Sequence, residues 1–268
     1  MKIFRKIRQK VLLENPSDRQ NGKFSKPASP AGRYFIYAIG EIVLVVIGIL
    51  IALQINNWNE TKKDDKALKE YLVKIKSHTL EDLRKLDTIS IGRTQIAEIC
   101  KKARMRILDK TEDQDLLLLK ISGLAFADFY FKPSTGGYEA LKNSSYFGKI
   151  NNTPLDSLLT KYHSLVDEIS ENEKSYNQYV ESQEAYLSTQ FDRSLILASA
   201  FLPLDSLTKR ATPQSEYDED FKEYTASAPY RNVISLAAFQ FDAMISQYNQ
   251  LNNVGLNVIE EIDAITND

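Results

Sequence analysis

The feature that most constrains this chain is the apolar stretch IGEIVLVVIGILIALQINNW at residues 39–58, which carries one acidic residue, Glu41, close to its start. The 22 residues from Tyr34 to Ile55 would form a helix about 33 Å long, enough to cross a hydrocarbon core of about 30 Å. The uninterrupted apolar run Ile42–Leu53 has only 12 residues, about 18 Å, and is too short to span alone. We therefore predict a transmembrane helix over 34–58, with Glu41 within or at the edge of the membrane.

The residues around this stretch predict its orientation. Residues 1–33 contain nine Lys or Arg against two acidic residues, a net charge of +7, whereas the charges over 60–70 balance. The positive-inside rule then places 1–33 in the cytoplasm as a basic head and 59–268 across the membrane. No small-x-small cleavage site follows the apolar core, so we expect an uncleaved signal-anchor. Aromatic rings stand at both ends of the span, where they are expected at headgroup level: Tyr34, Tyr37 and Trp58.

The part of the chain after the span reads as helix almost throughout. Its apolar residues recur at spacings of three and four, which is typical of helices that bury one face. We predict an all-α fold in which the single N-terminal transmembrane helix is followed by a periplasmic antiparallel bundle of about four long helices. These helices are expected near 60–108, 114–128, 154–191 and 228–265, with a short helix near 135–144. The connection 192–227 is predicted to be a long crossover loop, apolar in its first half and acidic in its second, that either faces a partner or only joins two helices.

Charge and composition limit the chemistry of this domain. From residue 42 onward the chain has 25 basic and 33 acidic residues, which disfavours a nucleic-acid partner because phosphate binding needs a basic surface. The one cysteine, Cys100, is predicted to be a buried apolar residue on a helix, and His78 and His163 have no Cys or His at ligand spacing. The Gly-Gly pair at 136–137 resembles an anion-binding turn, but a turn followed by an N-cap from the Ser or Thr before it needs no ligand. We expect no catalytic, cofactor-binding or metal-binding residues, and a protein that is not an enzyme.

One face of the predicted transmembrane helix combines small residues with the carboxylate, at spacings of three and four: Ala38, Glu41, Val45, Gly48 and Ala52. Small residues let helices approach closely, and a polar group in lipid finds a partner on a neighbouring helix. Three roles for Glu41 are open: snorkelling to the cytoplasmic headgroups, contact with a helix of a second copy or another protein, and proton coupling. The small residues favour helix contact, so we predict these five residues as a transmembrane association face.

Two stretches carry a resemblance to a known family. They are FIYAIGEIVLVVIGILIALQINNWNE, residues 35–60, behind the basic head MKIFRKIR, and FKPSTGGYEALKNSSYFGKINNTPLDSLLTKYH, residues 131–163. The chain resembles a Bacteroidota family of uncharacterised single-pass envelope proteins, from which it departs by an insertion-like segment, PSDRQNG…PASPAG, before the span. The resemblance implies a Gram-negative inner membrane and periplasm, and it supplies neither an activity nor site residues.

These observations favour a membrane-anchored scaffold or assembly subunit of an envelope complex. Its expected partners are the lipid bilayer and, through the transmembrane face, another protein or a second copy. A periplasmic ligand-sensing bundle is an alternative, although such receptors normally return through a second span, which 59–268 lack. A proton-coupled accessory subunit that uses Glu41 is a further alternative.

The first prediction concerns topology. Protease added to spheroplasts should digest residues 59–268 and leave an epitope placed on the basic head intact, because the net charge of +7 keeps the head in the cytoplasm. Immunoblots against epitopes at the two ends measure this, with a cytoplasmic protein as the control for intact membranes. Loss of the head epitope while the C-terminal epitope survives would reverse the orientation.

Overall fold

The computed structural model describes residues 30–109, 116–193 and 214–267, and all regular structure in these ranges is helical. The α-helices are α2 (Pro30–Asp109), α3 (Leu116–Ser122), α4 (Gly136–Lys142), α5 (Pro154–Gln190), α8 (Gln214–Ala226) and α9 (Ala228–Asn267). Two 3-10 helices, η1 (Gly123–Phe126) and η2 (Phe147–Lys149), complete the described elements. The predicted all-α class is confirmed over these ranges.

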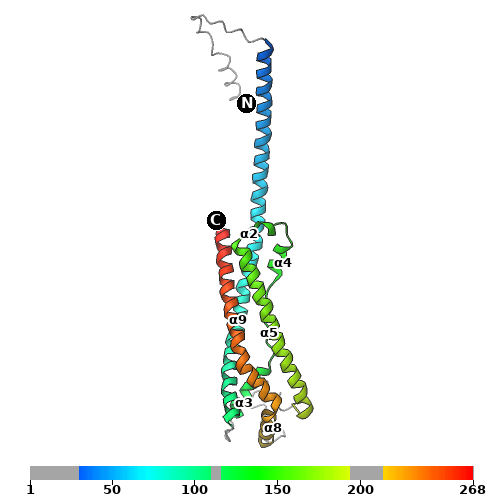
Figure 1. The fold of residues 1–268 in the computed structure, drawn as a ribbon, viewed down its shortest axis with the longest axis vertical. Coiled ribbons are helices and arrows are strands. Elements are labelled where there is room, and N and C mark those ends of the chain that lie inside the picture. Colours follow the sequence, from blue (N-terminus) through cyan, green and yellow to red (C-terminus); the bar gives the residue numbers. More distant parts are fainter. Residues whose placement is uncertain (1–29, 110–115, 194–213, 268) are drawn as a thin grey trace. The chain divides into compact units, whose positions relative to one another are not determined.

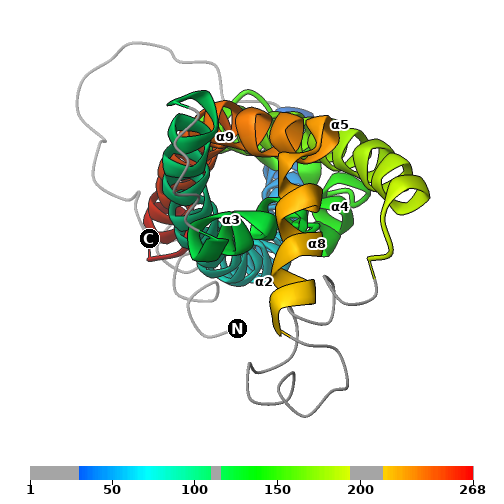
Figure 2. The same ribbon diagram turned by 90° about the horizontal axis from the view of Figure 1, so that it is seen from below.

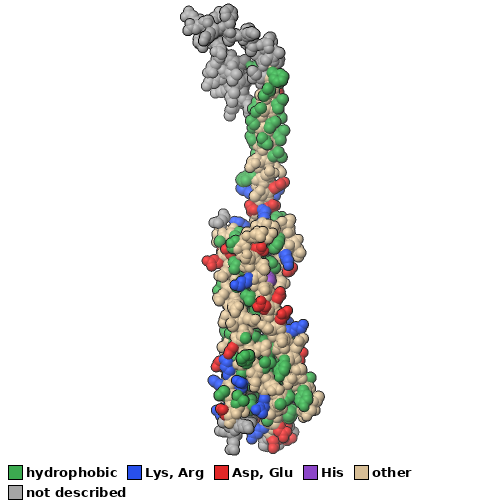
Figure 3. Space-filling view, viewed as in Figure 1, with side chains coloured by type: hydrophobic (Ala, Val, Ile, Leu, Met, Phe, Trp, Pro, Cys, Tyr) green, Lys and Arg blue, Asp and Glu red, His purple; other side chains and the backbone are tan. Residues whose placement is uncertain are grey.

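Contacts divide the chain into two compact units, with the boundary between Lys62 and Lys63 inside α2. In the first unit, large apolar side chains from Phe35 to Trp58 are 46–71% exposed, and Figure 3 shows them crowded on the surface of this helix. This helix is long and apolar enough to cross a membrane, and none of its apolar window is buried. These properties are consistent with the predicted membrane anchor. The predicted limits of the span, 34 and 58, are not marked by any break in α2.

The second unit contains three long helical segments that lie side by side: α2 beyond Lys63, α5 and α9 (Figures 1 and 2). Helices α2 and α5 run in the same direction, since Asp82 and Arg93 contact Tyr162 and Glu173 in the same order. Helix α9 runs against both. Successive contacts along α2 meet α9 in reverse order: Lys101 with Asp242, Lys76 with Asp263 and Lys69 with Thr266.

The prediction of about four long helices needs correction. Beside the three long helical segments, the fourth long part of the described second unit is only partly helical. Residues 116–153, which we name the return segment, run antiparallel to α2 and contain α3, η1, an extended stretch, α4 and η2. The helix predicted near 114–128 is limited to α3 and η1, whereas the short helix predicted near 135–144 is present as α4. Pro133 accounts for part of the extended stretch, because proline lacks an N–H and pushes the residue before it toward extended backbone.

The predicted crossover loop 192–227 also needs correction, because α8 occupies Gln214–Ala226 within it. Phe221 and Tyr224, three residues apart on this acidic helix, bury their rings, and the Tyr224 ring centroid lies 5.2 Å from that of Tyr230 on α9. An acidic segment therefore folds as a helix because one of its faces is aromatic. The apolar first half of the predicted loop falls mainly on 194–213, outside the described residues.

Local sequence explains where α5 begins. Thr153 is the N-cap, and its hydroxyl accepts a hydrogen bond from the backbone N–H of Asp156 at 3.3 Å. The Asp156 carboxylate in turn accepts from the N–H of Asn152 at 3.0 Å, so the two side chains satisfy two donors reciprocally. Pro154 at the first helical position loses no hydrogen bond there. At α4, by contrast, Thr135 makes no side-chain capping bond, so the N-cap predicted before the Gly-Gly pair is not formed.

The hydrophobic core lies wholly within the second unit, between Leu68 and Ile262. Cys100 is fully buried on α2, as predicted, and burial raises the pKa of its thiol to about 12. The thiol is therefore protonated at neutral pH and inert. This unit is not held by an intramolecular disulfide, because Cys100 is the only cysteine of the chain.

The second prediction follows from this self-contained core. A fragment of residues 63–268 should fold by itself and give a strongly helical circular dichroism spectrum, because all core residues lie inside it. Its thermal melt should be the same with and without reductant, since Cys100 is the only cysteine. A disordered spectrum, or a melt that shifts with reductant, would contradict an independent second unit.

Candidate functional site

The predicted association face lies on α2 in the first unit. Ala38, Glu41, Val45, Gly48 and Ala52 are all exposed, and a Cβ built on Gly48 meets nothing within 4 Å. The described residues therefore leave this face open, and its role in association stays a prediction.

The predicted interface anchors are also exposed where their side chains are described. Tyr37 is 63% and Trp58 60% exposed, and the side chain of Tyr34 lies outside the described part of the chain. Lys62 Nζ lies 3.9 Å from the centroid of the Trp58 ring, a cation–π contact one turn after the span.

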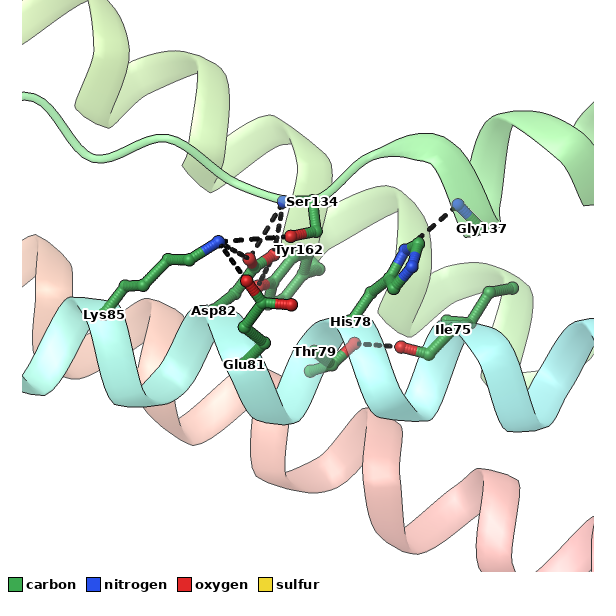
Figure 4. A network of polar contacts seen from close by, with 9 residues as sticks. All are labelled: Ile75, His78, Thr79, Glu81, Asp82, Lys85, Ser134, Gly137 and Tyr162. Carbon is green, nitrogen blue, oxygen red and sulfur yellow. Dashed lines mark hydrogen bonds and ion pairs between the residues drawn. The ribbon is translucent and has the colours of Figure 1, made fainter.

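A second candidate site was not predicted: a chain of polar side chains that holds the return segment against α2 and α5. Figure 4 shows its part on α2. The two carboxylate oxygens of Asp82 accept the backbone N–H of Ser134 at 2.9 and 3.0 Å, and the Tyr162 hydroxyl donates to Asp82 at 3.3 Å. Burial raises the pKa of the Asp82 carboxyl, and Lys85 Nζ lies 3.8 Å from it. Lys85 also donates to the Ser134 hydroxyl at 3.3 Å, so the cluster is closed on itself.

One turn along α2, His78 holds the start of α4 (Figure 4). Its Nδ1 accepts the backbone N–H of Gly137 at 3.2 Å. A Cβ on Gly137 would lie 3.1 Å from this nitrogen and 3.3 Å from the Ile75 nitrogen, so the close approach favours glycine. The Gly137 N–H is thus already used, which removes the anion-binding interpretation of the Gly-Gly pair.

The neighbouring ring contact joins α4 to α5. Tyr138 stacks on His163, with ring centroids 4.1 Å apart and planes 20° from parallel. Burial lowers the pKa of His163, because removal from water disfavours the charged imidazolium. The neutral imidazole is therefore favoured in this packed contact. The described ranges contain no cluster of three or more His, Cys, Asp or Glu that could hold a metal ion.

The most deeply buried part of the chain of polar contacts centres on Glu173 of α5. Its carboxylate accepts the backbone N–H of Phe131 at 2.7 Å and the hydroxyl of Tyr248 at 2.5 Å. Burial raises the pKa of Glu173, while these two hydrogen bonds and the nearby charge of Arg93 oppose that rise. The closest oxygen of Glu173 lies 3.6 Å from Arg93 Nη2, and both side chains are 1% exposed.

Arg93 completes this group from α2. Its Nη2 donates to the carbonyl oxygen of Phe129 at 3.0 Å, and its guanidinium carbon lies 4.9 Å from the centroid of the Phe241 ring. Asn177 donates to the same Phe129 carbonyl at 3.4 Å. The Nε of Arg93 has no hydrogen-bond partner among the described residues, and the aromatic ring offers the cation a face instead.

Side chains of the long helices also bond to backbone carbonyls at the beginning of the return segment. Tyr176 of α5 donates to the carbonyl oxygen of Ala125 at 2.7 Å, and Tyr230 of α9 donates to that of Leu119. The Ser122 hydroxyl and the Tyr230 hydroxyl share a further contact of 3.0 Å. Buried polar side chains from three long helices therefore pair backbone groups of an irregular segment inside the bundle.

These polar residues were missed although the sequence carries a signal for them. Arg93 stands four residues after Ile89 and three before Ile96, and Glu173 stands four after Ile169 and three before Tyr176. Each is a charged residue at a position where helical spacing requires an apolar one. Such a residue must find a buried partner, because an unpaired buried charge is too costly to keep.

Over the residues that the structure describes, the chain is helical, with one candidate membrane-spanning helix and a second unit organised around a return segment fixed by side chains. A model of a family of unknown function, DUF6090, matches residues 41–197, more than half of the chain, and the chain belongs to this family. The match contains Asp82, Arg93 and Glu173 and ends before α8 and α9. No curated protein and no solved structure matches the chain.

The third prediction tests the buried pair. Changing Glu173 to Gln keeps the side-chain shape but leaves Arg93 as an uncompensated buried charge, which should lower the free energy of unfolding by about 3 kcal/mol. Urea denaturation of the 63–268 fragment measures the change. Glu171→Gln, at an exposed position on the same helix, is the matched control and should change the free energy by less than about 0.5 kcal/mol.

A double variant tests whether the two charges act together. The loss in Arg93→Met combined with Glu173→Gln should be smaller than the sum of the single losses by about 1 kcal/mol or more, because neither charge is then left alone. Strictly additive losses would show that the 3.6 Å approach of the two side chains carries no interaction.

Proposed function

We propose that this protein is a scaffold or assembly subunit anchored in the inner membrane by a single span, with its N-terminus in the cytoplasm and its second unit in the periplasm. The observation that carries the proposal is the exposed apolar stretch of α2. Water-soluble proteins rarely expose an apolar surface of this size, whereas a membrane would cover it. The net charge of +7 over 1–33 supports the orientation. The Bacteroidota resemblance supports the inner membrane as the location.

The buried polar residues of the second unit support an interaction role over an enzymatic one. The carboxylates of Asp82 and Glu173 accept backbone N–H groups of the return segment, and Arg93 donates to a backbone carbonyl. Catalytic groups typically meet the substrate in an accessible pocket. These groups instead point into the packed interior, where they stabilise the fold that the protein presents to its partners.

Association in the membrane is proposed to use the face formed by Ala38, Glu41, Val45, Gly48 and Ala52. The small residues permit close approach of a second helix, and the Glu41 carboxyl can share a hydrogen bond across the contact. A carboxyl group placed in the bilayer without a partner costs on the order of 2–3 kcal/mol, which a helix partner would offset.

The fourth prediction separates association from the other roles of Glu41. Glu41→Gln can still hydrogen-bond, so association should largely survive, whereas Glu41→Leu should weaken it by about 1 kcal/mol. Gly48→Leu should weaken it more, because a bulky side chain holds the helices apart. Co-purification of differently tagged copies and of other bound proteins from mild detergent measures the effect.

Gly40→Leu is the matched control for Gly48→Leu. Gly40 is equally open, but it lies about 100° around the helix from Glu41 and outside the predicted face. Proton coupling predicts that Glu41→Gln is as damaging as Glu41→Leu, since neither side chain titrates. If all three variants on the face associate like the wild type, Glu41 only snorkels and the face is not an interface.

A further inference from the structure

The chain has two histidines, and both of them contact α4. His78 reaches this helix from α2, and His163 reaches it from α5. Helix α4 has only seven residues, and an isolated helix of that length is not stable in water. Its place in the second unit therefore depends on the contacts that α2 and α5 make with it.

The contact from α2 requires a neutral imidazole. His78 Nδ1 accepts the backbone N–H of Gly137 at 3.2 Å, and Gly137 is buried (Figure 4). A protonated imidazole carries a hydrogen on both ring nitrogens and can no longer accept a hydrogen bond. In the first turn of a helix, an N–H has no acceptor within the helix. Protonation of His78 would therefore set two donors against each other and leave a buried N–H without a partner.

The contact from α5 also favours a neutral imidazole. The His163 ring stacks on Tyr138 of α4, with centroids 4.1 Å apart, and it lies 5.6 Å from the ring of Tyr162. Lys142 Nζ lies 6.0 Å from the centroid of the Tyr138 ring, so a cation is already present beside this contact. A positive charge on His163 would be removed from water and repelled by Lys142.

Charged groups from three helices act on His163. Carboxylates on each of them raise its pKa, whereas burial and the Lys142 ammonium lower it: Glu139 on α4, Asp167 on α5 and Asp82 on α2. Burial is the largest of these effects, and the pKa of His163 lies below its ordinary value of 6.5.

The charged neighbourhood of His78 is different. Glu81, on the same helix, interacts electrostatically with His78, and its carboxylate is paired with Lys85 at 2.7 Å. From α4, the backbone at Gly136 and Gly137 faces the imidazole. The effect of protonation at this position therefore comes from the loss of the hydrogen-bond acceptor.

We propose that α4 is a pH-sensitive element, which the two neutral histidines hold against α2 and α5 and which their protonation releases. Protonation of histidines at about pH 5–6 switches interfaces in pH-sensing proteins. Release of α4 would expose Leu141, whose side chain is fully buried, and would change the surface of the second unit. This inference goes beyond the proposed function, because it concerns the second unit alone and stands whether or not the transmembrane face associates.

The direction of the pH effect differs between the histidine and the buried carboxylates. Because the pKa of His163 is lower in the packed contact than in a released segment, protons bind preferentially to the released form. The contact is fully stable above the ordinary histidine pKa of 6.5 and weakens as the pH falls below it. Burial raises the pKa of Asp82 and of Glu173, so proton uptake there favours the folded form. We therefore expect mild acid to release α4 without unfolding the whole unit.

The fifth prediction uses hydrogen–deuterium exchange of the full chain in mild detergent, at about pH 7.5 and about pH 5.5. After correction for the effect of pH on intrinsic exchange, protection of peptides covering 136–142 should fall at least about tenfold at the lower pH, because a buried hydrogen bond and a packed contact are lost. Peptides covering 165–180 of α5 are the control and should keep their protection. Unchanged protection of α4, or equal loss in both regions, would overturn the inference.

Replacements that do not titrate test whether the histidines cause the release. His78→Asn places an amide oxygen near the position of Nδ1, and His163→Phe keeps a flat ring against Tyr138. The double variant should keep α4 protected at both pH values, and its circular dichroism spectrum at the higher pH should match that of the wild type. Release that persists at the lower pH in this folded double variant would overturn the inference.

Two exposed charges of α4 provide a test that leaves both histidines in place. Glu139 raises the pKa of His163 and Lys142 lowers it. In a pH series, Glu139→Gln should therefore shift the release of α4 to lower pH, and Lys142→Gln should shift it to higher pH. A purely structural role of His163 predicts no such opposite shifts. Shifts in the same direction, or none, would overturn the inference even if the double variant did not fold.

Discussion

The structure of the second unit depends on one requirement: every backbone N–H and C=O that is removed from water needs a hydrogen-bond partner. A helix meets this requirement with its own backbone, but the extended part of the return segment cannot. It lies between long helices, which have no free backbone groups along their length to offer. Side chains must supply the partners, and this explains why Asp82, Glu173 and Arg93 stand at positions that helical packing would give to apolar residues.

The buried charges follow from the same requirement. A carboxylate is a stronger acceptor for an N–H than a neutral group, and a hydrogen bond to a charged group contributes about 1.5–3 kcal/mol. Desolvation opposes this gain, as the raised pKa values of Asp82 and Glu173 show. The approach of Arg93 to Glu173 and to the Phe241 ring offsets part of that cost. We expect this interior to favour one path for the return segment, since a different path would leave these charges without partners.

Most of the helices could be predicted from sequence because their signals are local. The exposed apolar helix, the start of α5 at Thr153-Pro154 and the burial of Cys100 all follow from neighbouring residues. The return segment could not be predicted in the same way. Its partners lie between 22 and 111 residues away along the chain, as for Ser122 with Cys100 and Leu119 with Tyr230. Helix α8 was missed because its acidic composition suggested a solvated loop, and only two buried rings reveal its packed face.

The spacing of the return segment's donors has a consequence for how this chain can vary. Phe131, Ser134 and Gly137 donate their N–H groups to fixed side chains on α5 and α2, at intervals of three residues. Surface connections usually tolerate insertions and deletions. Here, one added or removed residue would move every later donor out of register with its acceptor. This irregular stretch should therefore keep a constant length wherever the same side chains are present, as strictly as a core helix does.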